Sequence, residues 1–290
     1  MKWIAKIWGK SGSWKNIRGD EGLVIAKALY KELQKINKQE EKWLSAKGRN
    51  NVVKDKIYEK VPDGLSHTLE LAFEKAFSLV FLKGSKILEK TFDKEALQME
   101  FTVGDQLVEQ KQTKKSVKLL GKKQERDNLI NHASTTATGF GLGLLGMGLP
   151  DIPLLVSTIL KGLYEVALSY GFSYESKEEQ IYMLRLIRTA LATGEDRRKV
   201  FSECFSPAGS AILSSTDSGS ALPAIYEVDL SEEIKRTAKA LSDALLVEKF
   251  VQGIPIVGVV GGFVNYTVYK KILFLGKLEY KKRYLLSKGK

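Results

Sequence analysis

The sequence predicts an all-α protein: a single multi-helix bundle built around a central pair of glycine-rich apolar helices. Three observations lead to this fold class. Apolar residues recur with a helical period through most of the 290-residue chain. No run alternates apolar and polar residues for long enough to indicate a strand. Two stretches, residues 133–150 and 250–269, carry no charge and are threaded with glycines.

Residues 1–19 form a basic, tryptophan-rich segment. Trp3 and Trp8 fall on one helical face, lysines flank that face, and Trp14 follows. Tryptophan beside lysine is typical of an anchor at a membrane interface, so these three tryptophans are candidate membrane contacts. Docking of a short terminal helix on the body of the protein is the alternative.

Helical patterns dominate the first third of the chain. Apolar residues three or four positions apart predict a helix over residues 21–44. The turn Pro62-Asp63-Gly64 precedes a second predicted helix, over residues 65–90. Asp93 is a candidate N-cap for a third helix, because its carboxylate can accept from the first backbone N–H groups.

The centre of the chain holds its most distinctive motif, Leu149-Pro150-Asp151-Ile152-Pro153. Pro150 and Pro153 prevent one continuous helix through this point. Asp151 can cap a helix that begins at Ile152, with Pro153 in its first turn. The sequence therefore predicts apolar helices over residues 126–148 and 152–171 that meet at a tight corner. Gly171 would end the second of them, and a further helix is expected over residues 175–193.

The last third of the chain begins with a Ser-, Gly- and Pro-rich stretch, residues 206–223, which is expected to form a surface loop. A charged helix is expected from about Ser231 to Lys249, followed by the second glycine-rich stretch. The chain then becomes basic, and residues 286–290 are expected to be a tail. The run Lys281-Lys282-Arg283 supplies further candidate membrane contacts.

The glycines of the two apolar stretches have the spacing of closely packed helices. Gly139 and Gly143 are four residues apart, and so are Gly258 and Gly262. A glycine inside a helix costs about 1 kcal/mol relative to alanine, so repeated glycines need a packing reason. A helix that is apolar on all sides is either a core helix or a membrane span. Buried core is favoured, with conditional insertion into a membrane as the alternative, because Asp151 and Asn265 interrupt the apolar sequence.

The net charge of +12 resides at the two ends of the chain. Residues 1–18 and 267–290 together hold thirteen basic residues and one acidic residue, while the rest is balanced. Two basic ends predict contact with an anionic surface. The alternative is that these ends are exposed and rich in lysine for solubility alone. The first residues lack the apolar core of a secretory signal, and the single cysteine, Cys204, excludes an internal disulfide. These features favour the cytoplasm, at the inner face of the cell membrane.

The sequence predicts no catalytic, metal or cofactor site. It therefore favours a protein that is not an enzyme. Residues 141–146 match G-x-G-x-x-G, but neither the strand before it nor the acidic residue after it is present. His67 and His132 lack further ligands at metal-binding spacing. Cys204 has no local signature of a nucleophile. Asp151 is either a helix cap or a residue for insertion or partner contact. No nucleic-acid-binding motif is visible.

Several segments resemble the EcsC protein family, most strongly the block from the glycines to Pro-Asp-x-Pro. The resemblance covers about residues 20–285. It implies a bacterial helical protein that is cytoplasmic or membrane-peripheral, without agreed catalytic residues, and it implies a genetic link to an ABC transporter. The residues that carry it are Thr138, Gly139, Gly141, Gly143, Gly148, Leu149, Pro150, Asp151, Pro153, Ala167, Tyr170, Gly171, Arg185, Gly253, Pro255, Gly258, Gly261, Gly262 and Asn265.

Three functions are compatible with these features. The first is a non-enzymatic, membrane-associated accessory protein whose partner is an anionic membrane surface or a membrane protein such as an ABC transporter. The second is a membrane-perturbing effector, such as a toxin or a defence protein. The third is a lipid-binding protein or enzyme with a pocket between the apolar helices. The oligomeric state is not predicted.

Overall fold

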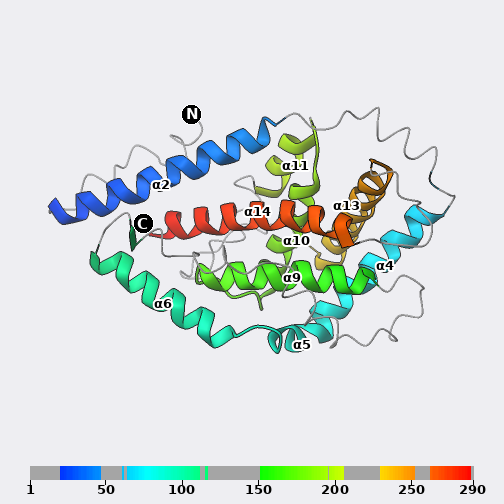
Figure 1. The fold of residues 1–290 in the computed structure, drawn as a ribbon, viewed down its shortest axis with the longest axis horizontal. Helices are drawn as coiled ribbons and strands as arrows, with labels where there is room; N and C mark the ends of the chain where they lie inside the picture. Colours follow the sequence, from blue (N-terminus) through cyan, green and yellow to red (C-terminus); the bar gives the residue numbers. More distant parts are fainter. Residues whose placement is uncertain are drawn as a thin grey trace.

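The computed structural model confirms the all-α fold class, because the described residues form helices and no strands (Figure 1). The description covers residues 20–46, 61, 64–111, 115–116, 151–194, 196–205, 229–251 and 262–288. The elements in chain order are α2 (Asp20–Leu44), α4 (Leu65–Leu79), a π-helical turn η2 (Val80–Gly84), α5 (Ser85–Glu89), α6 (Lys94–Lys111), α9 (Asp151–Ser169), α10 (Lys177–Leu191), α11 (Asp196–Phe205), α13 (Leu230–Val251) and α14 (Gly262–Ser287).

Two parallel helices, α9 and α14, form the centre of the molecule. α14 crosses the middle of the fold, with α2 along one side of it and α9 along the other (Figure 1). α13 packs on α4 and α10, and α6 packs on α9. Within the described residues, one helix is long and apolar enough to cross a membrane, Ile152–Ser169 in α9, and 78% of that stretch is buried inside the protein. Its burial identifies α9 as a core helix in this structure.

Glycines allow α9 and α14 to approach closely, although they are not the glycines that the sequence singled out. A Cβ on Gly162 of α9 would lie 2.8 Å from the Tyr269 hydroxyl and 3.0 Å from a Leu273 methyl. A Cβ on Gly276 of α14 would lie 2.8 Å from a Leu163 methyl. Small residues at the contact therefore set the separation of the central pair. The pairing of the two glycine-rich stretches stays a prediction, because residues 133–150 and 252–261 lie outside the described residues.

α9 ends in the turn that the sequence predicted at Gly171. Gly171 has φ 79°, and its N–H donates to the Leu168 carbonyl at 3.0 Å. The N–H of Phe172 donates to the Ala167 carbonyl at 2.9 Å, which completes a Schellman motif. The Phe101 ring of α6 lies only 2.3 Å from the position that a Cβ on Gly171 would take. Gly171 is therefore required by its dihedral angle and by the ring packed against it.

Side-chain caps begin the neighbouring helices. Asp93 accepts from the Ala96 N–H at 2.8 Å and caps α6, as predicted. Ser176 accepts from the Glu179 N–H at 3.2 Å and caps α10. The helix start predicted at Ile152 agrees with α9 within one residue, since Asp151 is its first residue.

Two parts of the last third differ from the sequence-based expectations. The basic residues from Lys270 to Arg283 lie in α14, which continues to Ser287, so the helix extends into the first two residues of the expected tail, 286–290. The short helix α11 was not anticipated, because its sequence DRRKVFSECF has few apolar residues at helical spacing. The predicted helix over residues 126–148 and the loop over 206–223 lie outside the described residues.

We expect Gly171→Ala to destabilise the protein by more than Gly64→Ala. Both glycines have φ 79°, but a Cβ on Gly64 meets nothing within 4 Å. The left-handed conformation alone costs a non-glycine residue about 1–2 kcal/mol, and Gly171→Ala must also displace Phe101. Chemical denaturation of both variants checks this difference. Equal losses of unfolding free energy in the two variants would contradict this expectation, because they would show that the Phe101 ring can move aside without a free-energy penalty.

Candidate functional site

The C-terminal half of α14 carries a run of polar residues, Glu279-Tyr280-Lys281-Lys282-Arg283-Tyr284, in the interior of the fold. Successive residues of a helix point about 100° apart, so these side chains reach different neighbouring helices. Glu279, Tyr280 and Tyr284 are buried, and the three basic residues are half-buried. Charged residues are rarely buried without partners, which makes this run the candidate functional site.

Arg283 forms a bidentate ion pair with Glu179 of α10. Its Nη1 lies 2.7 Å from Oε1 of Glu179, and its Nη2 lies 3.0 Å from Oε2. The Tyr280 hydroxyl donates to the same Oε1 at 2.5 Å. Two parallel N–H···O bonds fix both distance and orientation, so this pair sets the register of α14 against α10.

Aromatic rings enclose the Arg283 guanidinium. Its Cζ lies 4.1 Å from the ring centroid of Phe172, 4.2 Å from that of Tyr182 and 5.3 Å from that of Tyr280. Burial raises the pKa of the Tyr182 and Tyr280 phenols well above the usual range, so both remain neutral and present ring faces to the guanidinium, and the Tyr280 hydroxyl also donates to Glu179.

Local sequence places each member of this cluster. Ser176 caps α10 and Glu179 occupies the N3 position, where the helix dipole favours a negative charge. In a capping box the N3 carboxylate would bond back to the N-cap N–H. Here both of its oxygens bond to Arg283 instead. Phe172 follows Gly171, so the turn that ends α9 also places the Phe172 ring against the Arg283 guanidinium.

Glu279 lies between α14 and α2 and is 5% exposed. Burial raises its pKa to about 7, against the opposing effect of Lys282, and the neighbouring Glu40 carboxyl raises it further. Lys282 forms an ion pair with Glu40, which joins α14 to α2. Oε1 of Glu279 has no hydrogen-bond partner in the structure. This carboxyl is therefore the group of the site that titrates near neutral pH.

Ion pairs attach α2 to the rest of the protein. Lys281 lies 3.3 Å from Oε2 of Glu32, a residue that is 5% exposed. Burial alone would raise the pKa of Glu32, but hydrogen bonds and charge from Lys35 and Lys281 lower it below its ordinary value. The carboxylate of Glu32 is consequently ionised and held between two ammonium groups.

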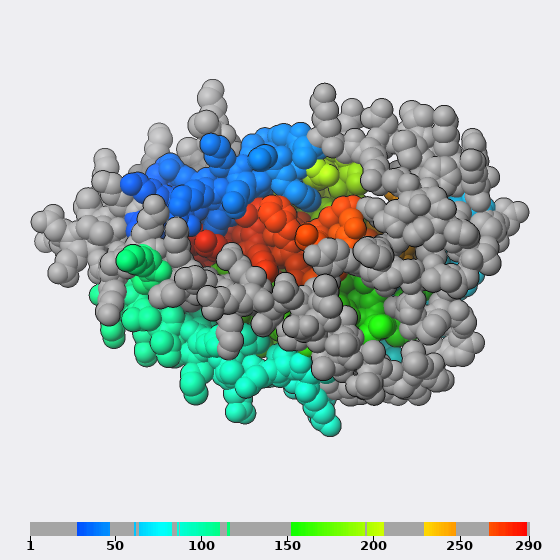
Figure 2. Space-filling view, viewed as in Figure 1, coloured from blue at the N-terminus to red at the C-terminus, as the bar shows by residue number. Residues whose placement is uncertain are grey.

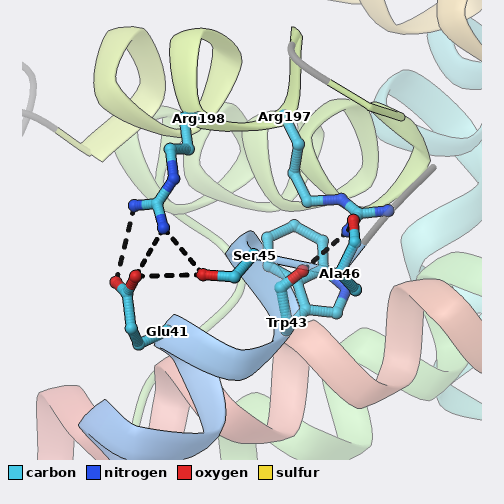
Figure 3. A network of polar contacts seen from close by, with 6 residues as sticks. All are labelled: Glu41, Trp43, Ser45, Ala46, Arg197 and Arg198. Carbon is cyan, nitrogen blue, oxygen red and sulfur yellow. Dashed lines mark hydrogen bonds and ion pairs between the residues drawn. The ribbon is translucent and has the colours of Figure 1, made fainter.

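The C-terminal end of α2 is clasped by two arginines of α11 (Figure 3). Arg197 Nη1 donates to the Trp43 carbonyl at 2.6 Å and to the Ala46 carbonyl at 3.0 Å, with its guanidinium 4.8 Å from the Trp43 ring centroid. Arg198 pairs with Glu41 and donates to the Ser45 hydroxyl at 2.8 Å. A cation at the negative end of a helix dipole stabilises that end, so α11 terminates α2.

A second buried polar cluster joins α10, α11 and α13. Glu233 is 3% exposed; its Oε1 lies 3.0 Å from Arg188 Nη2, and its Oε2 lies 3.7 Å from Arg185 Nε. Arg188 Nη2 and Glu233 Oε1 form an ion pair without the geometry of a hydrogen bond. Arg188 also donates to Cys204 Sγ at 3.1 Å. Burial raises the pKa of the Cys204 thiol, which makes it a poor nucleophile.

The structure separates the predicted site residues. Lys281, Lys282 and Arg283 lie together on α14, but each faces a carboxylate of this protein. Pro153 lies in the first turn of α9, and Gly262 and Asn265 lie in the first turn of α14. Membrane contact by the three basic residues stays a prediction, and for Lys281 and Lys282 it requires their pairs with α2 to open. The remaining predicted residues lie outside the described part of the chain: Trp3, Trp8, Trp14, Gly139, Gly141, Gly143, Gly148, Pro150, Gly258 and Gly261.

Sequence reasoning missed the acidic partners, although signals for them were present. Glu32 and Glu40 fall within the apolar stripe of α2 that includes Leu29, Leu33 and Ile36. A carboxylate on such a stripe predicts a buried cation opposite it. Ser176-x-x-Glu179 matches a capping box. Within the described residues, no group of three or more His, Cys, Asp or Glu side chains is arranged to hold a metal ion.

Comparison with known proteins gives one family and one curated relative. The model of the EcsC protein family matches residues 26–285. Protein EcsC of Bacillus subtilis (strain 168) is 25% identical over 150 residues, which cover 52% of this chain and 56% of that protein. The alignment thus spans little more than half of the relative. No solved structure matches.

We expect the loss of either partner of the Arg283–Glu179 pair to be strongly destabilising. Arg283→Met or Glu179→Gln would each cost about 3–5 kcal/mol, because the remaining charge stays buried without its partner. The double variant would cost less than the sum of the two. Urea denaturation of all three measures this coupling. Arg236→Gln is the control, because the exposed Arg236–Glu232 pair is worth under about 1 kcal/mol.

The raised pKa of Glu279 predicts that the folded protein loses stability as pH rises. Its pKa is raised from 4.5 to about 7 in the folded protein, so the folded state binds the additional proton between these values. That contribution is fully present below about pH 4.5 and disappears as pH rises through about 7. The groups that face Glu279 are Glu40 from α2, Tyr182 from α10, and Lys282 and Arg283 from its own helix.

The test compares the unfolding free energy of the wild type and of Glu279→Gln across this pH window. The glutamine variant should show a flatter profile, because its amide does not titrate. Identical profiles would show that Glu279 is ionised throughout.

Proposed function

The chain belongs to the EcsC protein family, and from that premise we propose that it is a non-enzymatic accessory protein working at the inner face of the cell membrane. In this proposal, the end of the molecule at which α9 and α14 begin faces the lipid. The observation that carries the proposal is the parallel arrangement of these two helices.

Contacts along the central pair show the parallel arrangement. Near the middle, Gly162 of α9 meets Leu273 of α14, and near the far end Tyr170 and Tyr284 lie with ring centroids 6.4 Å apart. Gly162 lies 11 residues after Asp151, and Leu273 lies 11 residues after Gly262. At a rise of 1.5 Å per residue, both helices begin about 16 Å from this contact. They therefore start at the same level of the molecule.

The two charge-free stretches join the described helices at that same end. Residues 133–150 lead directly into α9, and residues 252–261 lead directly into α14. An apolar sequence of this length and composition is suited to contact with lipid hydrocarbon. Two such sequences, joined to the fold at one end, support the proposal of a single membrane-facing surface.

The charged cluster supports a non-enzymatic role. Glu179 is bonded to Arg283 and Tyr280, and Glu233 is paired with two arginines. These groups hold helices together, and the Cys204 thiol has a raised pKa. The proposal therefore assigns no catalytic group and depends on binding alone.

Flotation with vesicles tests the proposed function. Vesicles of equal parts phosphatidylglycerol and phosphatidylcholine should carry the protein upward, with a fraction that survives high salt. Leu144→Asp and Val259→Asp should reduce that fraction at least tenfold, because a carboxylate in hydrocarbon costs about 3 kcal/mol. Met99→Asp is the matched control: Met99 is 68% exposed and lies on α6 near Phe101, which packs at the other end of α9.

Unchanged flotation of the two aspartate variants would overturn this assignment of the lipid-facing end. Failure of the wild type to float with any vesicle would overturn the membrane surface as the partner. The next candidate partner would then be a membrane protein, such as an ABC transporter, that contacts the same end of the molecule.

A further inference from the structure

Four basic side chains on α11 and α14 contact a single segment, α2 and the residues that end it. Lys281 pairs with Glu32, Lys282 with Glu40 and Arg198 with Glu41. Arg197 donates to the last carbonyls of α2. In Figures 1 and 2, α2 lies along the edge of the molecule, beside α14. The acidic groups of one peripheral helix thus occupy a cationic surface formed by two others.

We propose that α2 is a displaceable strap, and that anionic phospholipid headgroups compete with its glutamates for Lys281, Lys282 and Arg198 and with the carbonyls at its C-terminal end for Arg197. The inference rests on the proposed membrane association and adds a second, regulated contact, because Lys281 lies 19 residues after Gly262 and therefore about 28 Å along α14 from the end assigned to lipid. While α2 is docked, the cationic surface is neutralised. When α2 leaves, the surface faces an anionic membrane. Guanidinium groups bind phosphate in a bidentate manner and ammonium groups attract it as point charges, so these four side chains suit that ligand.

The attachment of α2 is in part exposed and sensitive to salt. Among the described elements, α2 packs mainly on α14. Among its described side chains, the buried apolar ones are Leu29, Leu33, Ile36 and Leu44. The Glu41–Arg198 pair is more than half exposed on both sides, and such pairs contribute little and are screened by salt. The Glu32–Lys281 and Glu40–Lys282 pairs are more buried, so a competing anionic surface would act first at the exposed Glu41–Arg198 pair.

Glu279 lowers the stability of the docked state further. It is buried between α14 and α2, beside the Glu40 carboxyl, and its Oε1 has no hydrogen-bond partner. Such a group loses the hydration that it would regain when α2 departs. The buried Glu279 carboxyl therefore favours the release of α2.

The cationic surface would stay in place after α2 leaves. α14 is held to α10 by the Arg283–Glu179 pair and to α9 by close packing around Gly276. α11 is packed on α10. Arg283 faces α10 rather than α2, so the proposal excludes it from the lipid-binding set.

The first test weakens the strap without altering the cations. In Glu32→Gln/Glu40→Gln/Glu41→Gln, the three acidic partners become neutral. The triple variant should bind phosphatidylglycerol–phosphatidylcholine vesicles at least tenfold more tightly than the wild type, since each basic residue near an anionic surface adds about 1 kcal/mol and two such residues already exceed the roughly 1.4 kcal/mol of a tenfold change. The matched control is Glu95→Gln/Glu178→Gln/Glu203→Gln, which changes the net charge equally at exposed positions. Equal gains in both triple variants would overturn the proposal, because net charge alone would explain them.

The second test measures the displacement of α2. Spin labels at Lys38→Cys on α2 and Lys199→Cys on α11, in a Cys204→Ala background, report one distance across the clasp; both positions are exposed. Phosphatidylglycerol vesicles should lengthen this distance, and phosphatidylcholine vesicles should leave it unchanged. Lys281→Gln/Lys282→Gln should abolish the response of the distance to vesicles.

The outcomes separate the strap from the proposed function. Vesicle binding with an unchanged distance would overturn the strap and leave membrane association standing. A distance that lengthens with a soluble polyanion, such as heparin, and not with vesicles would overturn lipid as the occupant. Absence of any vesicle binding by the wild type and the triple variant alike would overturn both.

Discussion

The arrangement of helices around α14 depends on the ion pair between Arg283 and Glu179. A guanidinium bonded through two nitrogens, and enclosed by three rings, tolerates little sliding or rotation of the helix that carries it. With Arg283 directed at α10, the neighbouring residues of α14 are directed elsewhere. Lys281 and Lys282 meet the acids of α2, and the Tyr284 hydroxyl donates to Asp105 of α6 at 2.7 Å. One buried contact thus determines which face of α14 each peripheral helix meets.

The second constraint is the separation of α9 from α14, which Gly162 and Gly276 keep small. Close contact buries most of the apolar length of α9, a helix that would otherwise have the composition of a membrane span. The two constraints act on different parts of α14. Glycine packing fixes its distance from α9, and the ion pair fixes its rotation against α10.

The described helices of the first two thirds could be predicted from the sequence because their signals are local, while the helix expected over residues 126–148 stays a prediction. Asp93 and Gly171 act within one turn of their own positions, and the structure confirms both. The course of α14 could not be predicted in the same way. Its basic run resembles a solvated tail until Glu32, Glu40 and Glu179 are known to lie opposite, and these residues are more than 100 positions away. Gly162 and Gly276 were missed for a similar reason, since single glycines carry no spacing signal. The roles predicted for Trp3, Gly143 and Gly258 stay predictions.

The clasp on α2 has a consequence for the order in which the protein matures. Glu40 and Lys282 are 242 positions apart, and Arg197 is 154 positions from the carbonyl that it caps. A ribosome adding roughly 5–20 residues per second needs about 12–50 s to make the residues between Glu40 and Lys282. During that time α2 is a finished amphipathic sequence whose docking surface has not been synthesised. The first of the described helices would therefore be among the last to dock, and a nascent-chain factor or the membrane would meet it before α14 does.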